Sequence, residues 1–250
     1  MVRRRLVSSR SAARVAVEEG RVRVDGMPAP KVASLVEENA KVAMVGEPAP
    51  FVSRGGEKLE GALTAFGINV TGSRCLDAGA STGGFTDCLL QRGAAEVVAV
   101  DVGYGQLDWK LRQDERVTVI ERTNIRTADP TAIGAPFDVI VADLSFISLA
   151  TVAPALASFG VESTQYILLV KPQFEAGKGR VGKGGVVRDP AVHRECVENV
   201  AAAMASAGYP AHTVVASSLV GPAGNREFLV RCSRTGTGIA AKELEQAVAP

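Results

Sequence analysis

Four charged side chains lie at the ends of apolar segments of this chain. Lys58 falls in the first turn of a predicted helix, in SRGGEKL, while Asp143 and Lys171 end the runs VIVAD and YILLVK. Glu227 begins the last apolar run. Taken singly, such residues are often solvated caps, but two lysines and two carboxylates facing one pocket would form an acid–base set. That set suits group transfer to a weakly acidic hydroxyl, whose proton must leave as its oxygen attacks.

A lysine removes such a proton near neutral pH only if its pKa is lowered from the ordinary value of about 10.4. A second lysine nearby and loss of contact with water both lower an amine pKa, and a carboxylate can orient the amine and the hydroxyl. Alignment of the two reactants lowers the activation barrier by about 7–11 kcal/mol. The charged set therefore predicts methyl transfer to a ribose 2′-hydroxyl, if the fold brings these residues together.

A glycine-rich turn in CLDAGASTGGF joins a predicted strand to a predicted helix. Its glycines, Gly79, Gly83 and Gly84, let backbone N–H groups approach a ligand, and the helix N-terminus favours a negative group. Ser81 stands where a dinucleotide fingerprint has its second glycine. Asp101 ends the next strand, about twenty residues on, where a carboxylate can accept hydrogen bonds from ribose hydroxyls. The turn predicts a nucleoside-containing cofactor, either NAD or S-adenosylmethionine.

Short apolar runs alternate with helical stripes from residue 57 onward. Strands are predicted over 74–80, 96–102, 117–122, 137–143, 166–171, 213–219 and 227–231, and helices over 57–66, 86–91, 106–112, 148–159, 191–207 and 240–248. This alternation predicts a Rossmann-like α/β fold with a mainly parallel, doubly wound sheet, to which a final hairpin adds one antiparallel strand. Ligands of such sheets bind beyond the carboxyl ends of the strands, where Asp143 and Lys171 fall.

Composition and charge indicate the class of protein and the division of the chain into domains. The 250 residues carry a net charge of +1, but eight basic residues face three acidic ones before residue 32, which predicts a small basic head that binds a polyanion. We place this head at residues 1–46, a proline-containing linker at 47–54 and the main domain at 55–250. No apolar run approaches 18 residues and no signal peptide is visible. Four scattered cysteines and two histidines predict a metal-free, reduced, cytoplasmic chain.

The chain resembles the TlyA family of ribosomal RNA 2′-O-methyltransferases, which also carries the name haemolysin. The resemblance covers almost the whole chain and rests on SRGGEKL, CLDAGASTGGFTDCLLQRGA, VDVGYGQL, ERTN, ADLSFISL, VKPQFEAGKG and GNREF. Within the wider FtsJ-like group it implies a Rossmann-like class I methyltransferase domain, with a mainly parallel seven-stranded sheet and a C-terminal antiparallel hairpin. Before that domain it implies a small α+β RNA-binding domain, named after ribosomal protein S-four.

The resemblance also implies roles for individual residues. In the Lys-Asp-Lys-Glu tetrad, Lys171 would be the general base, Lys58 and Asp143 would position the hydroxyl and the methyl group, and Glu227 would hold the lysines. The methyl donor would be S-adenosylmethionine, with no metal. Its binding residues would be Asp77, Gly79, Ala80, Ser81, Thr82, Gly83, Gly84, Phe85, Asp101, Thr123, Asn124, Ile125 and Asp143. RNA would contact Arg3, Ser9, Arg10, Arg14, Arg21 and Lys31.

The chain departs from the family pattern at its start. Met1 falls inside the first helix of the RNA-binding domain, so we expect either an upstream start codon or a shortened domain. By resemblance the substrate is a cytidine in large-subunit ribosomal RNA, with the small subunit as a second candidate.

Three other functions stay open from the residues alone. ADLSF is loosely like the D-P-P-[YF] motif of enzymes that methylate base nitrogens, although its prolines are missing. A non-catalytic RNA-binding or ribosome-assembly factor would keep the basic head, and the haemolysin name suggests a membrane-active protein, although no membrane partner is expected. The sequence leaves the oligomeric state open.

Overall fold

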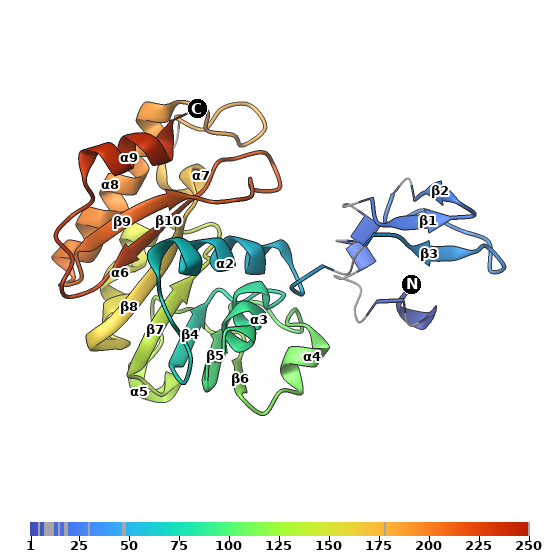
Figure 1. Cartoon of the computed structure of the whole chain (residues 1–250), viewed down its shortest axis with the longest axis horizontal. Helices are drawn as coiled ribbons and strands as arrows, with labels where there is room; N and C mark the ends of the chain where they lie inside the picture. Colours follow the sequence, from blue (N-terminus) through green and yellow to red (C-terminus); the bar gives the residue numbers. More distant parts are fainter. Residues whose placement is uncertain are drawn as a thin grey trace.

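The computed structural model describes residues 1–250 except residues 5, 8–12, 15, 18–19, 30, 47–48, 178 and 250. Within the described residues the strands form two sheets, one small and one large. The small sheet is antiparallel in the order β2-β1-β3 and contains β1 (Val22–Val24), β2 (Met27–Pro28) and β3 (Val42–Met44), after the 3-10 turn η1 (Val2–Arg4). Figure 1 shows it beside the larger domain, joined to it through the segment that leads into α2 (Arg54–Phe66).

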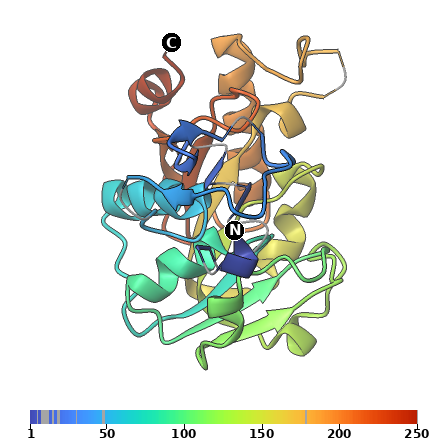
Figure 2. The same cartoon turned by 90° about the vertical axis from the view of Figure 1, so that its right-hand side faces the viewer.

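The large sheet has the order β6-β5-β4-β7-β8-β10-β9. Its strands are β4 (Arg74–Ala78), β5 (Glu96–Val100), β6 (Val117–Ile120), β7 (Phe137–Ala142), β8 (Gly160–Val170), β9 (Ala211–Ala216) and β10 (Phe228–Cys232). The strands from β6 to β8 run parallel, and β10 pairs antiparallel with both β8 and β9. This confirms the predicted α/β fold, its mainly parallel seven-stranded sheet and its C-terminal antiparallel pair. Figure 2 views the same arrangement from the side of the small sheet.

Helices cover both faces of the large sheet (Figure 1). Besides α2 they are α3 (Gly84–Gln91), α4 (Trp109–Arg112), α5 (Pro130–Ile133), α6 (Leu149–Ala157), α7 (Pro172–Glu175), α8 (Pro190–Ser206) and α9 (Ala241–Val248). Alternate residues of the strands face opposite sides: on β7, Ile140 packs with α6, α8 and α9, whereas Val139 packs with α2 and α3. The two cores fix the sheet between two helical layers.

Several element boundaries differ from the sequence prediction. Helix α2 starts at Arg54 rather than at residue 57, because Ser53 is already extended and the three residues after it are helical. Strand β8 starts at Gly160 rather than at residue 166, because Gly160 already pairs with Phe137 of β7; the register then shifts before Val139 pairs with Gln165, and residues 161–163 are exposed. The short helices α5 and α7 were not predicted; each begins at a proline, whose fixed φ suits the first helical turn.

Candidate active site

The site lies at the carboxyl edge of the parallel strands, and the glycine turn after β4 forms its floor. Gly79 has φ +89°, and a Cβ atom there would lie 2.5 Å from the carbonyl oxygen of Asp143. The Gly79 N–H donates to Val100, and the Asp143 N–H donates to Ala78. Position 79 therefore has no room for a side chain, and its backbone lies directly against the end of β7.

Asp101 ties this turn to the loop after β5. Its Oδ2 accepts a hydrogen bond of 2.8 Å from the backbone N–H of Ser81, and its Oδ1 accepts one of 2.6 Å from Gly103. Ser81 adopts a left-handed φ of +48°, which the carboxylate contact stabilises. Asp101 is half-buried, so lone pairs of both oxygens stay available to a ligand in the adjoining cavity. Gln106, which sequence reasoning missed, lies 3.4 Å from the Ser81 hydroxyl.

Lys58 and Glu227 form a buried ion pair although 169 positions separate them. Lys58 comes from the first half of α2, and Glu227 from the residue before β10. Their side chains are only 8% and 1% exposed. Gly221 makes room for the carboxylate, because a Cβ atom there would lie 2.6 Å from Glu227 Oε1. The pair therefore links α2 to the start of the antiparallel strand β10.

Lys171 and Asp143 form the second ion pair, between the ends of the neighbouring strands β8 and β7. The Lys171 Nζ also donates a hydrogen bond of 3.0 Å to the hydroxyl of Ser145. Sequence reasoning missed Ser145, although it lies in the quoted motif ADLSFISL, two residues after Asp143. Phe146 follows with φ +65° and is 91% exposed, and its ring lies against that of Phe174.

Two cavities meet at this edge and share Gly79, Ser81 and Asp143. The first has a volume of about 370 Å³ and is lined by Asp101, Thr123, Asn124 and Ile125, among others. The second has a volume of about 380 Å³ and is lined by residues of both ion pairs and of the glycine turn: Lys58, Asp143, Lys171, Glu227, Ala80, Thr82, Gly84 and Phe85. The tetrad residues that lie far apart in the sequence thus share one cavity.

Asp77 and Gly83 line neither cavity. Asp77 is fully buried within β4 and accepts a hydrogen bond of 2.6 Å from the hydroxyl of Thr86 in α3. Burial raises the pKa of Asp77 to about 7, and the Thr86 bond only partly offsets that rise. Gly83 caps α3 with φ +96°. Both residues therefore stabilise the turn without lining a cavity.

The candidate RNA-binding residues lie in the small domain. Arg3 is exposed and pairs with Glu38, and Arg14 and Lys31 are exposed. Arg21 is half-buried beside β1. Ser9 and Arg10 lie outside the described residues.

The described part of the chain contains no group of three or more histidine, cysteine or acidic residues that could hold a metal ion. All four cysteines are free and buried, and burial raises the pKa of the Cys75 and Cys196 thiols to about 12. Among the described helices, none is long and apolar enough to cross a membrane.

Comparison with known proteins identifies the family. Residues 51–234 match the family described as FtsJ-like methyltransferase, and residues 1–42 match the S4 domain. The chain belongs to the FtsJ-like methyltransferase family. It is 53% identical over 250 residues to the 16S/23S rRNA (cytidine-2′-O)-methyltransferase TlyA of Mycobacterium tuberculosis, covering 99% of this chain and 93% of that protein. The putative rRNA methyltransferase YqxC of Bacillus subtilis is 43% identical, over 98% of this chain and 88% of its own. The predicted family and the predicted S4-type domain at the head of the chain are confirmed.

Solved structures agree with this family. A putative hemolysin from Streptococcus thermophilus is 39% identical with a TM-score of 0.80, and covers 98% of this chain and 90% of that one. A fibrillarin from Aeropyrum pernix in complex with S-adenosyl-L-methionine, 14% identical with a TM-score of 0.51, covers 71% of this chain and 75% of that one and shares the fold alone. The family match makes this chain a methyltransferase, as the charged residues predicted, whereas the glycine turn had left NAD and S-adenosylmethionine open.

Proposed function

We propose that this FtsJ-like methyltransferase transfers the methyl group of S-adenosylmethionine to the 2′-hydroxyl of a cytidine ribose in ribosomal RNA. The observation that carries the proposal is the Lys171–Asp143 pair at the junction of the two cavities, with Lys58 and Glu227 in the same cavity. The names of the relatives supply the substrate: that of M. tuberculosis is named for both 16S and 23S RNA. The two ribosomal subunits are therefore the candidate substrates.

The residues at the strand edge fit the proposed methyl donor. The left-handed Gly79 packs against Asp143 and lines both cavities, and Asp101 offers carboxylate oxygens to ribose hydroxyls. We assign the adenosine end to the cavity with Thr123, Asn124 and Ile125, and the methionine end to the cavity with the glycine turn. When bound, S-adenosylmethionine supplies an electrophilic methyl group on a positively charged sulfur.

The four side chains of the tetrad have different roles in the reaction of the ribose hydroxyl. Lys171 already donates to one hydroxyl, that of Ser145, so its Nζ is placed to bond to another from the cavity. As the neutral amine, Lys171 accepts the 2′-hydroxyl proton while the ribose oxygen bonds to the methyl carbon and the carbon–sulfur electron pair leaves with sulfur. Asp143 orients the Lys171 amine. Lys58, held by Glu227, places a positive charge beside the developing oxyanion.

The small basic domain docks the RNA in this proposal. Basic side chains there contact phosphates, which supplies affinity and register but little sequence choice; the candidates are Arg3, Ser9, Arg10, Arg14, Arg21 and Lys31. We propose residues 1–46 for this domain, 47–54 for the linker and 55–250 for the methyltransferase domain. A ribosomal substrate places the enzyme in the cytoplasm.

The test is transfer of a labelled methyl group from S-adenosylmethionine to separated ribosomal subunits, with the wild type beside Lys171→Ala. A matched control is Lys242→Ala, which removes an exposed lysine of α9 outside both cavities. We expect label in RNA with the wild type and the control only. Since a 2′-O-methyl group blocks alkaline cleavage, the label should appear in an alkali-resistant dinucleotide.

Each other outcome contradicts one part of the proposal. Label in alkali-sensitive nucleotides means methylation of a base, and no label on either subunit with the wild type contradicts the RNA substrate. Full activity of Lys171→Ala removes Lys171 from the role of general base.

A further inference from the structure

Glu175, which lies outside the tetrad, joins the segments that follow Lys171 and Asp143. Strands β7 and β8 are parallel neighbours, and their pairing ends with Ala142 opposite Leu168, two residues before the last residue of β8. Backbone pairing between β7 and β8 stops there: β7 continues into the loop after Asp143, whereas β8 runs on beside β10 to Val170 and is followed by the short helix α7. The position of the lysine amine relative to Asp143 therefore depends on what holds these two segments together.

Glu175 is the last residue of α7, the short helix that follows Lys171. Its Oε1 accepts a hydrogen bond of 2.7 Å from the backbone N–H of Leu149, and its Oε2 accepts one of 2.6 Å from the hydroxyl of Ser148. Both donors stand at the start of α6, which follows the segment after Asp143. Ser148 holds the N-cap position of α6 but makes no cap bond with its own side chain. Glu175 therefore supplies the cap from the neighbouring segment.

Two further contacts close the same junction. The amine of Lys171 donates to Ser145, and the ring of Phe174 lies 5.2 Å, between centroids, from that of Phe146. Phe146 is held in a left-handed conformation, which costs free energy for a residue with a large side chain. Such a conformation persists only where surrounding contacts fix it, and Glu175 fixes the chain just after it.

Partial burial of the Glu175 carboxylate costs free energy. Desolvation raises its pKa, and the bonds from Ser148 and Leu149 lower it again only in part. Glu175 lines neither of the two cavities, so it does not touch the reacting groups. A half-buried carboxylate that lies away from the reacting groups and is bonded across the two catalytic segments indicates a positioning role.

We propose that Glu175 is a positioning residue for methyl transfer, which fastens the segment after Asp143 to the segment after Lys171 and so keeps the lysine amine beside Ser145 and Asp143. This inference rests on the proposed function. Because the amine must meet a hydroxyl at hydrogen-bond distance, loosening of the junction lowers the rate of the chemical step. Binding of S-adenosylmethionine is left intact, since the glycine turn and Asp101 are held by other contacts.

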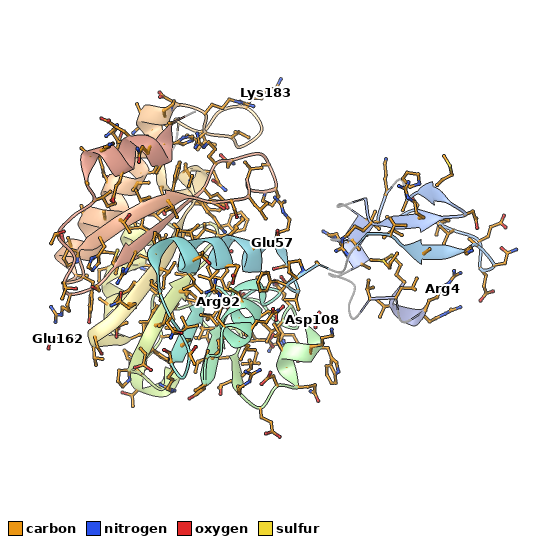
Figure 3. All side chains as sticks on the ribbon, in the orientation of Figure 1. Arg4, Glu57, Arg92, Asp108, Glu162 and Lys183 are labelled. Carbon is orange, nitrogen blue, oxygen red and sulfur yellow. The ribbon has the colours of Figure 1, made fainter. Side chains whose placement is uncertain are left out.

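The test compares Glu175→Ala with Glu175→Gln. The glutamine oxygen still accepts from Leu149 and its amide can donate to Ser148, so it keeps the junction without the charge. Glu162→Ala is the matched control, because Glu162 is exposed at the other end of β8 (Figure 3). We expect Glu175→Ala to lower kcat about 10–100-fold, as small misplacements of reacting groups do. The Kd for S-adenosylmethionine and the KM for RNA should stay unchanged, and Tm should fall by about 2–4 °C.

The rate of Glu175→Gln distinguishes a positioning role of Glu175 from a general loss of structure in Glu175→Ala. Recovery of most of the rate in Glu175→Gln supports the proposal, whereas a glutamine variant as slow as the alanine variant overturns it. Wild-type kcat in Glu175→Ala, or a loss that follows Kd or the folded fraction, also overturns it.

A second readout does not depend on the RNA substrate. The Lys171 Nζ to Ser145 Oγ distance is 3.0 Å in the present structure. Crystal structures of the wild type and Glu175→Gln should show this contact, and that of Glu175→Ala should not. An unchanged distance in Glu175→Ala overturns the proposal. If the wild type methylates no RNA while this distance responds as expected, the proposed substrate is wrong and the positioning role stands.

Discussion

The buried pair of Lys58 and Glu227 should dominate the stability of the junction between α2 and β10. We consider Lys58→Met, which keeps the length of the side chain but removes its charge. Glu227 is then a carboxylate with a 1% exposed side chain and no cationic partner. Removing one partner of a buried ion pair costs about 3–5 kcal/mol, because the remaining charge is neither solvated nor paired. With a urea m-value of about 2–3 kcal/mol per molar, the unfolding midpoint should fall by about 1–2 M.

A double-mutant cycle separates this loss from the cost of the methionine itself. Replacing both partners, in Lys58→Met with Glu227→Leu, leaves no uncompensated charge, and apolar replacements of a buried pair are often neutral or stabilising. We expect the double variant to be more stable than the sum of the two single losses predicts, with a coupling of about 2–3 kcal/mol. The measurement is urea unfolding followed by far-ultraviolet circular dichroism.

The same variants separate folding from chemistry. The double variant should be folded and yet inactive in methyl transfer, because the positive charge beside the ribose oxygen is gone. A loss below about 1 kcal/mol in Lys58→Met would refute the magnitude derived from burial. Strict additivity of the two substitutions would refute the pairing, and an active double variant would remove both residues from the reaction.

Three further predictions concern the glycine turn. Gly79→Ala should cost about 2–4 kcal/mol in urea unfolding, because the residue is left-handed and its Cβ atom would meet the Asp143 carbonyl oxygen; wild-type stability would contradict the geometry. Asp101→Ala should weaken S-adenosylmethionine binding at least about tenfold by calorimetry, since it loses the ribose acceptor and frees two backbone donors; an unchanged Kd would exclude the assignment. Burial raises the pKa of Asp77 to about 7, so the folded chain keeps a proton that the unfolded chain releases above about pH 4, and stability falls as pH rises towards 7. Asp77→Asn should remove this part of the pH dependence, and identical slopes for the two proteins between pH 5 and 8 would contradict it.

Much of the fold could be predicted from the sequence because its signals are local. Alternating apolar strands and helical stripes specify βαβ units, and the handedness of their connections leaves few arrangements for a parallel sheet. The boundaries were less well predicted: β8 extends six residues further back than its apolar run, where pairing of Gly160 and Gln165 with β7, and not hydrophobicity, sets its start. The place of β10 between β8 and β9 also depends on pairing between distant segments.

The sequence by itself determined which residues of the candidate site stand at strand ends, since a glycine turn, a carboxylate about twenty residues on and a charged residue after an apolar run are local patterns. Only the tertiary structure decided their partners. Lys58 pairs with Glu227, far along the chain, and Lys171 with Asp143, because the sheet brings these segments to one edge. Glu175 gave no signal, since its role depends on two donors that packing alone places beside its carboxylate.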